Sequence, residues 1–186
     1  FGKNLSFIDK YVFDYLPRDR NIYFDNESAY EFYNGVVYNK KTSTAMFGIG
    51  TDYTNEIKIK DGTKIIADHF YVDAFTRWRK KTHNDASQWY NGNIIIPEGV
   101  EIIGALAFYD CRISGLSLPS TLKKIGNCAF SGNYLKRLWL YNSITEIGEY
   151  AFSNSVNDET EIHFQDNTFY DGKNFMINNT LIYTKQ

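Results

Sequence analysis

The residues best suited to catalysis or metal binding are few, and their spacing suits neither role. Histidine occurs at His69, His83 and His163, and no two of these have a metal-binding spacing such as His-x-x-x-His. The sequence contains no nucleophile elbow, phosphate-binding loop or dinucleotide fingerprint, and Gly48-Ile-Gly50 is only a Gly-x-Gly. We therefore expect no metal, no cofactor and no catalytic site.

One segment mixes cations with an aromatic residue, Arg77-Trp78-Arg79-Lys80-Lys81. Tryptophan among cations can bind an anionic polymer or stack on a base. The alternative is an exposed loop whose tryptophan anchors it on the fold. We favour the loop, because residues 72–90 carry four cations against two acids, a net charge of only +2.

Composition excludes several protein classes. The chain of 186 residues is 43% hydrophobic and 23% charged, which is ordinary for a folded domain and not for a disordered one. Its longest apolar run, about 102–109, is far shorter than the roughly 20 residues of a membrane helix. The formal charge of -2 gives no overall field that attracts nucleic acid, so we expect no such partner.

A repeat of 22 residues supplies the framework that positions any site. The segments 94–108, 116–130 and 138–152 align without a gap, and seven positions keep their chemistry in all three. In each segment two apolar residues flank one residue, a further apolar residue follows, and the segment ends as Ile-Gly-x-x-Ala-Phe. Such a constant offset identifies a solenoid of stacked coils.

Each part of the repeat has a physical interpretation. Leu116 and Leu118 around Ser117 predict a short strand with one buried face, and Pro119 ends it. The Ile-Gly-x-x-Ala-Phe segment returns the chain, and we expect brief helical turns there. One coil cannot bury its own apolar face, so stacked coils share one core, with parallel strands about 4.8 Å apart.

Weaker copies extend the array to about five coils. Residues 57–66 resemble 94–103, residues 7–13 resemble 124–130, and further strands are expected at 22–24 and 162–164. Residues 34–40 lead through a polar turn into 45–49 and predict a β-hairpin within about 30–50.

The hairpin sequence recurs at 179–185, an offset of 145, and ends before a return strand. We therefore interpret residues 1–186 as one domain cut from a longer array. Its repeats are clearest at 94–159, and a polar insertion occupies about 76–93.

The two cysteines fall at different positions of the repeat. Cys128 projects back by one coil to position 106, five residues from Cys111. A disulfide would need distortion of the coils, and we favour two core thiols.

The strand residues that point outward are better candidates for binding than the basic segment. They come from successive coils and are Lys58, Ile95, Ser117, Trp139 and His163. Trp139 follows Lys136 and Arg137, and aromatic residues beside arginine are typical of protein-binding hot spots. The alternative is that Trp139 lies against a neighbouring loop or strand.

The repeat, best seen as Ile-Pro-x-x-Val-x-x-Ile-Gly-x-x-Ala-Phe at 96–108, resembles the BspA-like, or Treponema-type, leucine-rich repeats. The resemblance is strong over 94–152 and moderate over 7–66 and 160–186, whereas 72–93 departs from the pattern. It implies a strand-rich α/β solenoid of right-handed coils with short parallel strands and helical turns, interrupted by a β-hairpin. The family has no catalytic residues that could be transferred to this chain.

The resemblance also implies a function. Members of the family are mostly surface or secreted proteins of bacteria, and several are implicated in adhesion. We therefore expect a non-enzymatic binding module, located at the cell surface or secreted, whose partner is a protein of a host or neighbouring cell. The alternative is a structural spacer that positions another domain. An aromatic or charged patch on one face favours the binding module, and a uniformly polar face favours the spacer.

Overall fold

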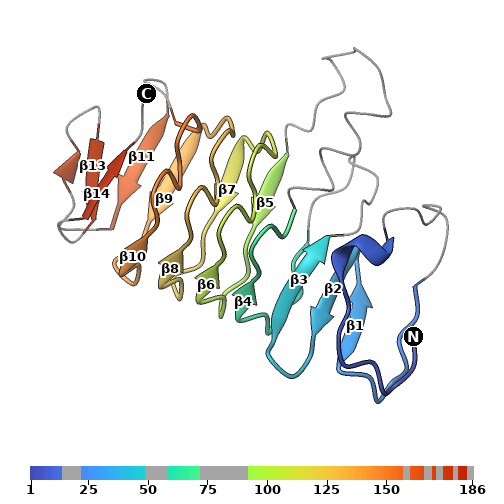
Figure 1. The fold of residues 1–186 in the computed structure, drawn as a ribbon. Coiled ribbons are helices and arrows are strands. Elements are labelled where there is room, and N and C mark those ends of the chain that lie inside the picture. Colours follow the sequence, from blue (N-terminus) through green and yellow to red (C-terminus); the bar gives the residue numbers. More distant parts are fainter. Residues whose placement is uncertain are drawn as a thin grey trace, which may run out of the picture.

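The computed structural model describes residues 1–13, 22–48, 58–71, 92–156, 160–165, 169–170, 174–177 and 180–183. These residues form three sheets and one short 3-10 helix, η1 (Lys10–Phe13). Sheet A has the order β1-β2-β3-β4-β6-β8-β10, sheet B the order β11-β9-β7-β5, and a third sheet the order β12-β13-β14 (Figure 1).

The strands are short. Those of sheet A are β1 (Tyr30–Tyr33), β2 (Val36–Asn39), β3 (Thr44–Gly48), β4 (Ile65–Ile66), β6 (Ile102–Ile103), β8 (Lys124–Ile125) and β10 (Glu146–Ile147). Those of sheet B are β5 (Asn93–Ile95), β7 (Gly115–Ser117), β9 (Arg137–Leu140) and β11 (Glu161–Phe164). Those of the third sheet are β12 (Phe169–Tyr170), β13 (Asn174–Ile177) and β14 (Thr180–Tyr183).

The 22-residue repeat becomes one coil of a strand-rich solenoid. Within the repeats each coil contributes one strand to sheet A and one to sheet B, all pairing in parallel (Figure 1). Ile94 pairs with Leu116, and Ile103 pairs with Ile125. Residues that are 22 positions apart in the sequence are therefore partners in the sheets. The sequence predicts the strands of sheet B. It does not predict the two-residue strands of sheet A, which pair with one another in a separate sheet.

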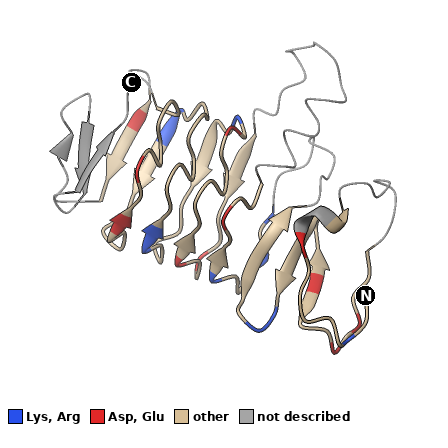
Figure 2. Ribbon diagram, viewed as in Figure 1, with Lys and Arg blue, Asp and Glu red and all other residues tan. Residues whose placement is uncertain are grey.

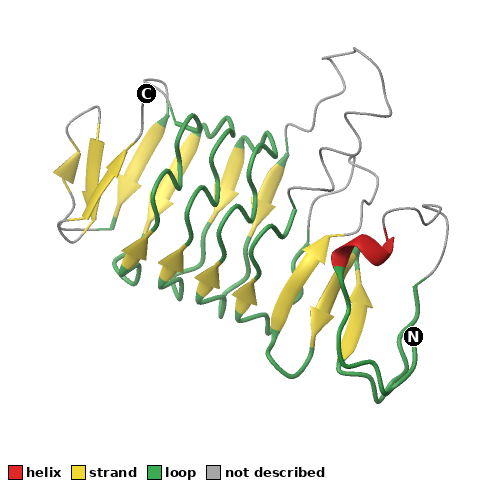
Figure 3. Cartoon of the chain, in the orientation of Figure 1, coloured by secondary structure: helices red, strands yellow, loops and turns green. Residues whose placement is uncertain are grey.

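The expected helical turns are absent from the described coils, where the return segments are hydrogen-bonded turns (Figure 3). Alternate backbone N–H groups of one return donate to the next coil, as Phe108 N does to the Ala129 carbonyl at 2.7 Å. A helix would direct these groups to its own carbonyls. A left-handed residue in the middle of each return, such as Leu106 (φ 56°) or Tyr150 (φ 58°), also interrupts any helix.

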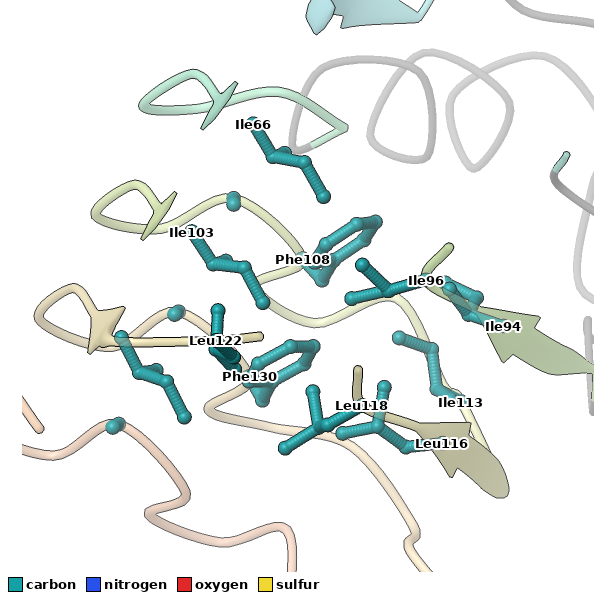
Figure 4. Close-up of a cluster of buried hydrophobic side chains, with 14 of the residues drawn as sticks. Ile66, Ile94, Ile96, Ile103, Phe108, Ile113, Leu116, Leu118, Leu122 and Phe130 are labelled. Carbon is teal, nitrogen blue, oxygen red and sulfur yellow. The ribbon is translucent and has the colours of Figure 1, made fainter. Parts of the chain in front are cut away.

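The repeat phenylalanines form the centre of the core. Phe108, Phe130 and Phe152 stack on one another, with centroids 5.3 and 5.5 Å apart and nearly parallel rings. Phe70 continues this column one coil earlier in an edge-to-face contact with Phe108. Figure 4 shows Phe108 and Phe130 among inward side chains of both sheets, as the repeat predicts.

The conserved spacing of the repeat glycines has a steric cause. A Cβ on Gly126 would overlap the backbone of Ala105 in the preceding coil, and one on Gly148 would overlap the backbone of Asn127. Glycine therefore lets consecutive coils approach closely where each coil leaves sheet A.

The predicted hairpin is present and covers the first coil. β2 and β3 pair antiparallel, and β3 continues in parallel onto β4, so the hairpin joins the solenoid through sheet A (Figure 1). β14 lies in the second copy of the hairpin sequence and pairs antiparallel with β13, which precedes that copy, as β2 pairs with β1 in the first copy.

The N-terminal residues do not form the expected coil. Residues 22–25 form no strand of the solenoid; their backbone instead bonds to Phe1, through the Asp25 N–H and the Tyr23 carbonyl. Residues 10–13 form η1, and Ile8 and Phe13 belong to a second apolar cluster with Val37 and Phe47. Among the described residues sheet B accordingly has four strands, and the solenoid has about four coils where the sequence predicts about five.

A buried asparagine ties three coils together. Asn133 donates through Nδ2 to the carbonyls of Phe108 (2.9 Å) and Phe130 (2.6 Å), and its Oδ1 accepts from Ile113 N at 2.9 Å. The backbone N–H of Asn133 donates to Ser155 Oγ at 2.9 Å. One coil earlier the same repeat position holds the buried thiol of Cys111. The polar connection between the coils is therefore particular to Asn133, whose amide satisfies buried backbone groups.

Candidate ligand-binding face

The outward face of sheet B carries the predicted column of side chains. In β9, Leu138 and Leu140 are buried while Arg137 and Trp139 are exposed, and β5 and β7 alternate in the same sense. Ile95 is 55% exposed and Trp139 is 45% exposed, although both are large and apolar. The orientation predicted for this column is therefore confirmed.

Trp139 is exposed and also packs on its neighbour in the next strand. Its ring stacks on that of His163, with centroids 4.9 Å apart and planes 16° from parallel. The two residues are register partners in β9 and β11, so the parallel pairing itself places one ring on the other. Tyr141 approaches the tryptophan from along the chain, at 6.4 Å. Trp139 thus lies against a neighbouring strand, as the alternative interpretation expects, and nearly half of the residue remains accessible.

Charged residues lie beside this aromatic pair. Arg137 and Glu161, also register partners, form an ion pair through Nε and Oε2 at 2.7 Å. His163 Nε2 lies 3.8 Å from the same Oε2 atom. Arg137 is 76% exposed at its side chain, so the ion pair contributes at most about 1 kcal/mol to folding and remains open to a ligand.

A trough runs along β7 on the same face. The outward residues of β7 are Gly115 and Ser117, which are smaller than Asn93 and Ile95 on β5 or Arg137 and Trp139 on β9. The resulting groove has a volume of about 900 Å³. Its lining residues are Asn93, Ile94, Ile95, Ser114, Gly115, Leu116, Ser117, Tyr134, Leu135, Lys136, Arg137 and Glu161.

The outer face of sheet A differs in character. Its charges alternate along the stack and pair between coils, as Lys123 does with Glu101 and Lys124 with Glu146, both at 2.6 Å (Figure 2). The hydrogen bond from Lys123 is the main cause that lowers the pKa of Glu101, followed by the charge of Lys123. Paired surface charges are typical of a solvated face. Sheet B therefore offers the better binding surface.

Comparison with known families and structures accounts for this architecture. The BspA type leucine rich repeat region matches residues 87–184 in six copies, which is more than half of the chain. The chain belongs to this family. Comparison with curated proteins finds no match.

Two solved structures are similar to this leucine-rich repeat chain. The crystal structure of the pneumococcal vaccine antigen PcpA matches with a TM-score of 0.59 at 22% identity, over 77% of this chain and 33% of that one. A leucine-rich repeat protein from Bacteroides ovatus has a TM-score of 0.41 at 21% identity, over 73% and 39%. The first match supports the solenoid fold, and the chain spans well under half of the length of either structure.

The other residues that the sequence predicts for the site fall into two groups. Lys58 bridges to Ile95 at the edge of sheet B, and Lys136 lines the trough, so both join the face that carries Trp139. The basic segment with Arg77, Trp78 and Arg79 lies outside the described residues.

Three residues of the leucine-rich repeat face escaped the sequence reasoning: Gly115, Tyr134 and Glu161. Gly115 and Tyr134 line the trough, and the side chain of Asn93 lies over Gly115, where a Cβ would otherwise stand. Glu161 pairs with Arg137. The signal for Gly115 and Glu161 is the residue before the first apolar position of each repeat, which reads Asn93, Gly115, Arg137 and Glu161. That column lies outside the seven shared positions of the repeat, because its chemistry differs between the coils.

The described residues offer little to support another chemistry. They contain no group of three or more histidine, cysteine or acidic residues that could hold a metal ion, and no helix long and apolar enough to cross a membrane. Both thiols are free. Cys111 is buried, as predicted, and burial raises the pKa of its thiol. Cys128 is only partly buried, because it occupies the left-handed position of its return turn (φ 53°), and the prediction of a core thiol is wrong there.

Proposed function

We propose that this chain is a non-enzymatic binding module of a cell-surface or secreted bacterial protein, and that it binds another protein through the outer face of sheet B. The observation that carries the proposal is the half-exposed Trp139, which is held against His163 beside the Arg137–Glu161 pair. Leucine-rich repeat families in general bind proteins and do not catalyse reactions, and the similar PcpA structure is that of a vaccine antigen. Adhesion to a host or neighbouring cell is the specific form of binding that we propose.

The energetics favour such a role for Trp139. Stacking fixes the ring before a ligand arrives, so binding loses little side-chain entropy. A rigid aromatic residue with an adjacent arginine is the combination that dominates measured interface energies. The alternative, a structural spacer, does not require exposed tryptophan and isoleucine side chains on sheet B. Paired charges, such as those on the outer face of sheet A, would serve a spacer equally well.

The test compares Trp139→Ala with Tyr109→Ala, which removes a similarly exposed aromatic side chain (41%) from a return segment outside sheet B. The immobilised chain captures proteins from solubilised extracellular matrix and cell-surface fractions, and each captured protein is purified and measured by surface plasmon resonance. We expect Trp139→Ala to weaken binding about 30-fold, which corresponds to a hot spot of about 2 kcal/mol. Tyr109→Ala should change Kd less than twofold.

Two results would contradict the proposal. Equal losses for the two variants would show that the face of sheet B is not the binding surface, and no saturable partner at all would favour the spacer. The melting temperature of Trp139→Ala should stay close to that of the unmodified chain, whereas a large decrease would show that the residue acts in folding.

A further inference from the structure

The trough along β7 has a shape and a polarity that together define a class of partner. We infer that it binds an extended acidic segment of a protein, with an apolar side chain at one end and a carboxylate two residues away at the other. This inference rests on the proposed function, since it names the ligand of the same face.

The first step is the geometry of the floor. Gly115 and Ser117 are two residues apart on one face of β7, which corresponds to about 6.7 Å along a strand. Two side chains of an extended segment lying along β7 have the same spacing when they point to the same side. The walls from β5 and β9 stand on either side of this floor, so the segment lies between them.

The second step is the apolar end. Ile95 is the register partner of Ser117 on one side. On the other side Gly115 pairs with Arg137. The same register places Trp139, two residues further along β9, beside Ser117 at the margin of the trough. Ile95 and Trp139 are both about half exposed. An apolar side chain that fits between them removes apolar surface from water on both sides, at about 25 cal/mol for each Å² buried. Ser117 leaves the space for it, because a larger residue here would fill the gap between Ile95 and Trp139.

The third step is the charged end. Lys136 and Arg137 line this end of the trough, where the amide side chain of Asn93 lies over Gly115. Glu161 is the single acid among the described lining residues. Glu161 uses the Nε donor of Arg137. The side chain of Arg137 is 76% exposed, so its terminal guanidinium nitrogens face solvent and can take a second carboxylate. Two cations against one acid leave this end with a net charge of +1, so a partner's carboxylate is attracted and a basic side chain is repelled.

The same observations disfavour nucleic acid and simple polyanions. Such ligands need a track of cations that follows a phosphate backbone. Here the two cations sit at one end of a trough whose other end is apolar. A segment with one apolar and one acidic side chain matches both ends.

The experiment is selection from a phage-displayed library of random peptides on the immobilised chain. Enrichment of an apolar residue followed two positions later by Asp or Glu is the expected result, measured on the synthetic peptide by fluorescence anisotropy. Exchange of that acid for Gln in the peptide should weaken binding about tenfold at low salt, and in Arg137→Gln the same exchange should have less than a threefold effect.

A bulky residue in the trough provides the second arm. Ser117→Trp should weaken the selected peptide at least tenfold, whereas Thr145→Trp, which adds the same bulk to an exposed site near sheet A, should leave Kd within twofold. Enriched basic peptides, no enriched peptide, or equal effects of the two tryptophans would overturn the inference. If a captured protein nevertheless binds Trp139→Ala more weakly than the unmodified chain, this inference is wrong while the proposed function stands.

Discussion

Replacement of Asn133 by alanine should destabilise the solenoid more than any other loss of one amide side chain at a described position of the coils. Asn133 is 1% exposed, and its side chain links the coils that contain Phe108, Ile113 and Phe130. In Asn133→Ala, the Ile113 N–H and the Phe108 carbonyl lose this partner in an interior that is closed to water. The Phe130 carbonyl retains the hydroxyl of Ser155.

The magnitude follows from two buried groups. Each backbone group that loses its partner costs about 1–2 kcal/mol, so we expect a decrease of about 2–4 kcal/mol in the free energy of unfolding. A chain of this size loses roughly 2–4 °C of melting temperature per kcal/mol, which predicts a decrease of about 5–15 °C.

Urea denaturation followed by circular dichroism measures this change. The matched control is Asn127→Ala, which removes one exposed hydrogen bond, from Glu149 N to Asn127 Oδ1 at 3.0 Å. We expect the control to lose less than about 1 kcal/mol. If both variants lose the same free energy, the buried asparagine does not hold the coils together, and this explanation of the position is refuted.

Two further predictions concern the coils. Gly126→Ala should lower the free energy of unfolding by about 1–3 kcal/mol in the same assay, because its Cβ overlaps the Ala105 backbone, whereas Gly2→Ala, with open space around it, should be neutral; equal stability of the two variants would contradict the close approach of the coils. Cys128 should react with Ellman's reagent at pH 8 and Cys111 only after denaturation, because burial raises the pKa of the Cys111 thiol; the unfolded thiol ionises near pH 8.5, so the free energy of unfolding should also decrease as the pH rises above about 8.5. Simultaneous reaction of both thiols would show that Cys111 is accessible.

The core of the solenoid could be predicted because its signals are local and repeat. The apolar residues Ile94, Leu116 and Leu138 point into the core in each coil, and the constant offset of the repeat also gives the pairing register of the strands. The return segments could not be predicted in the same way. Ala-Phe after Ile-Gly suits a helical turn by propensity, but stacking satisfies the backbone N–H groups in the next coil, and this outcome depends on contacts between coils.

The candidate site was predictable only in part for a related reason. Strand alternation places Trp139 and His163 outward, so their face could be predicted from the sequence. The trough depends on the difference between neighbouring coils, since Gly115 is small only in comparison with Asn93 and Arg137. An alignment that searches for shared chemistry discards such a column. Here the trough arises because the residues in that column differ in size from coil to coil.

The contrast between the two faces of β9 explains how this fold can separate stability from recognition. Leu138 and Leu140 have apolar equivalents in every clear repeat, because a polar residue there would lose its partners in the shared core. Arg137 and Trp139 have unlike equivalents, and each is paired with a residue of its own face. Substitutions on the outward side change the surface without disturbing the register that holds the coils. A leucine-rich repeat of this kind can therefore acquire a new ligand by exchanging outward residues one coil at a time, and residues that depart from the repeat are where its specificity should be sought.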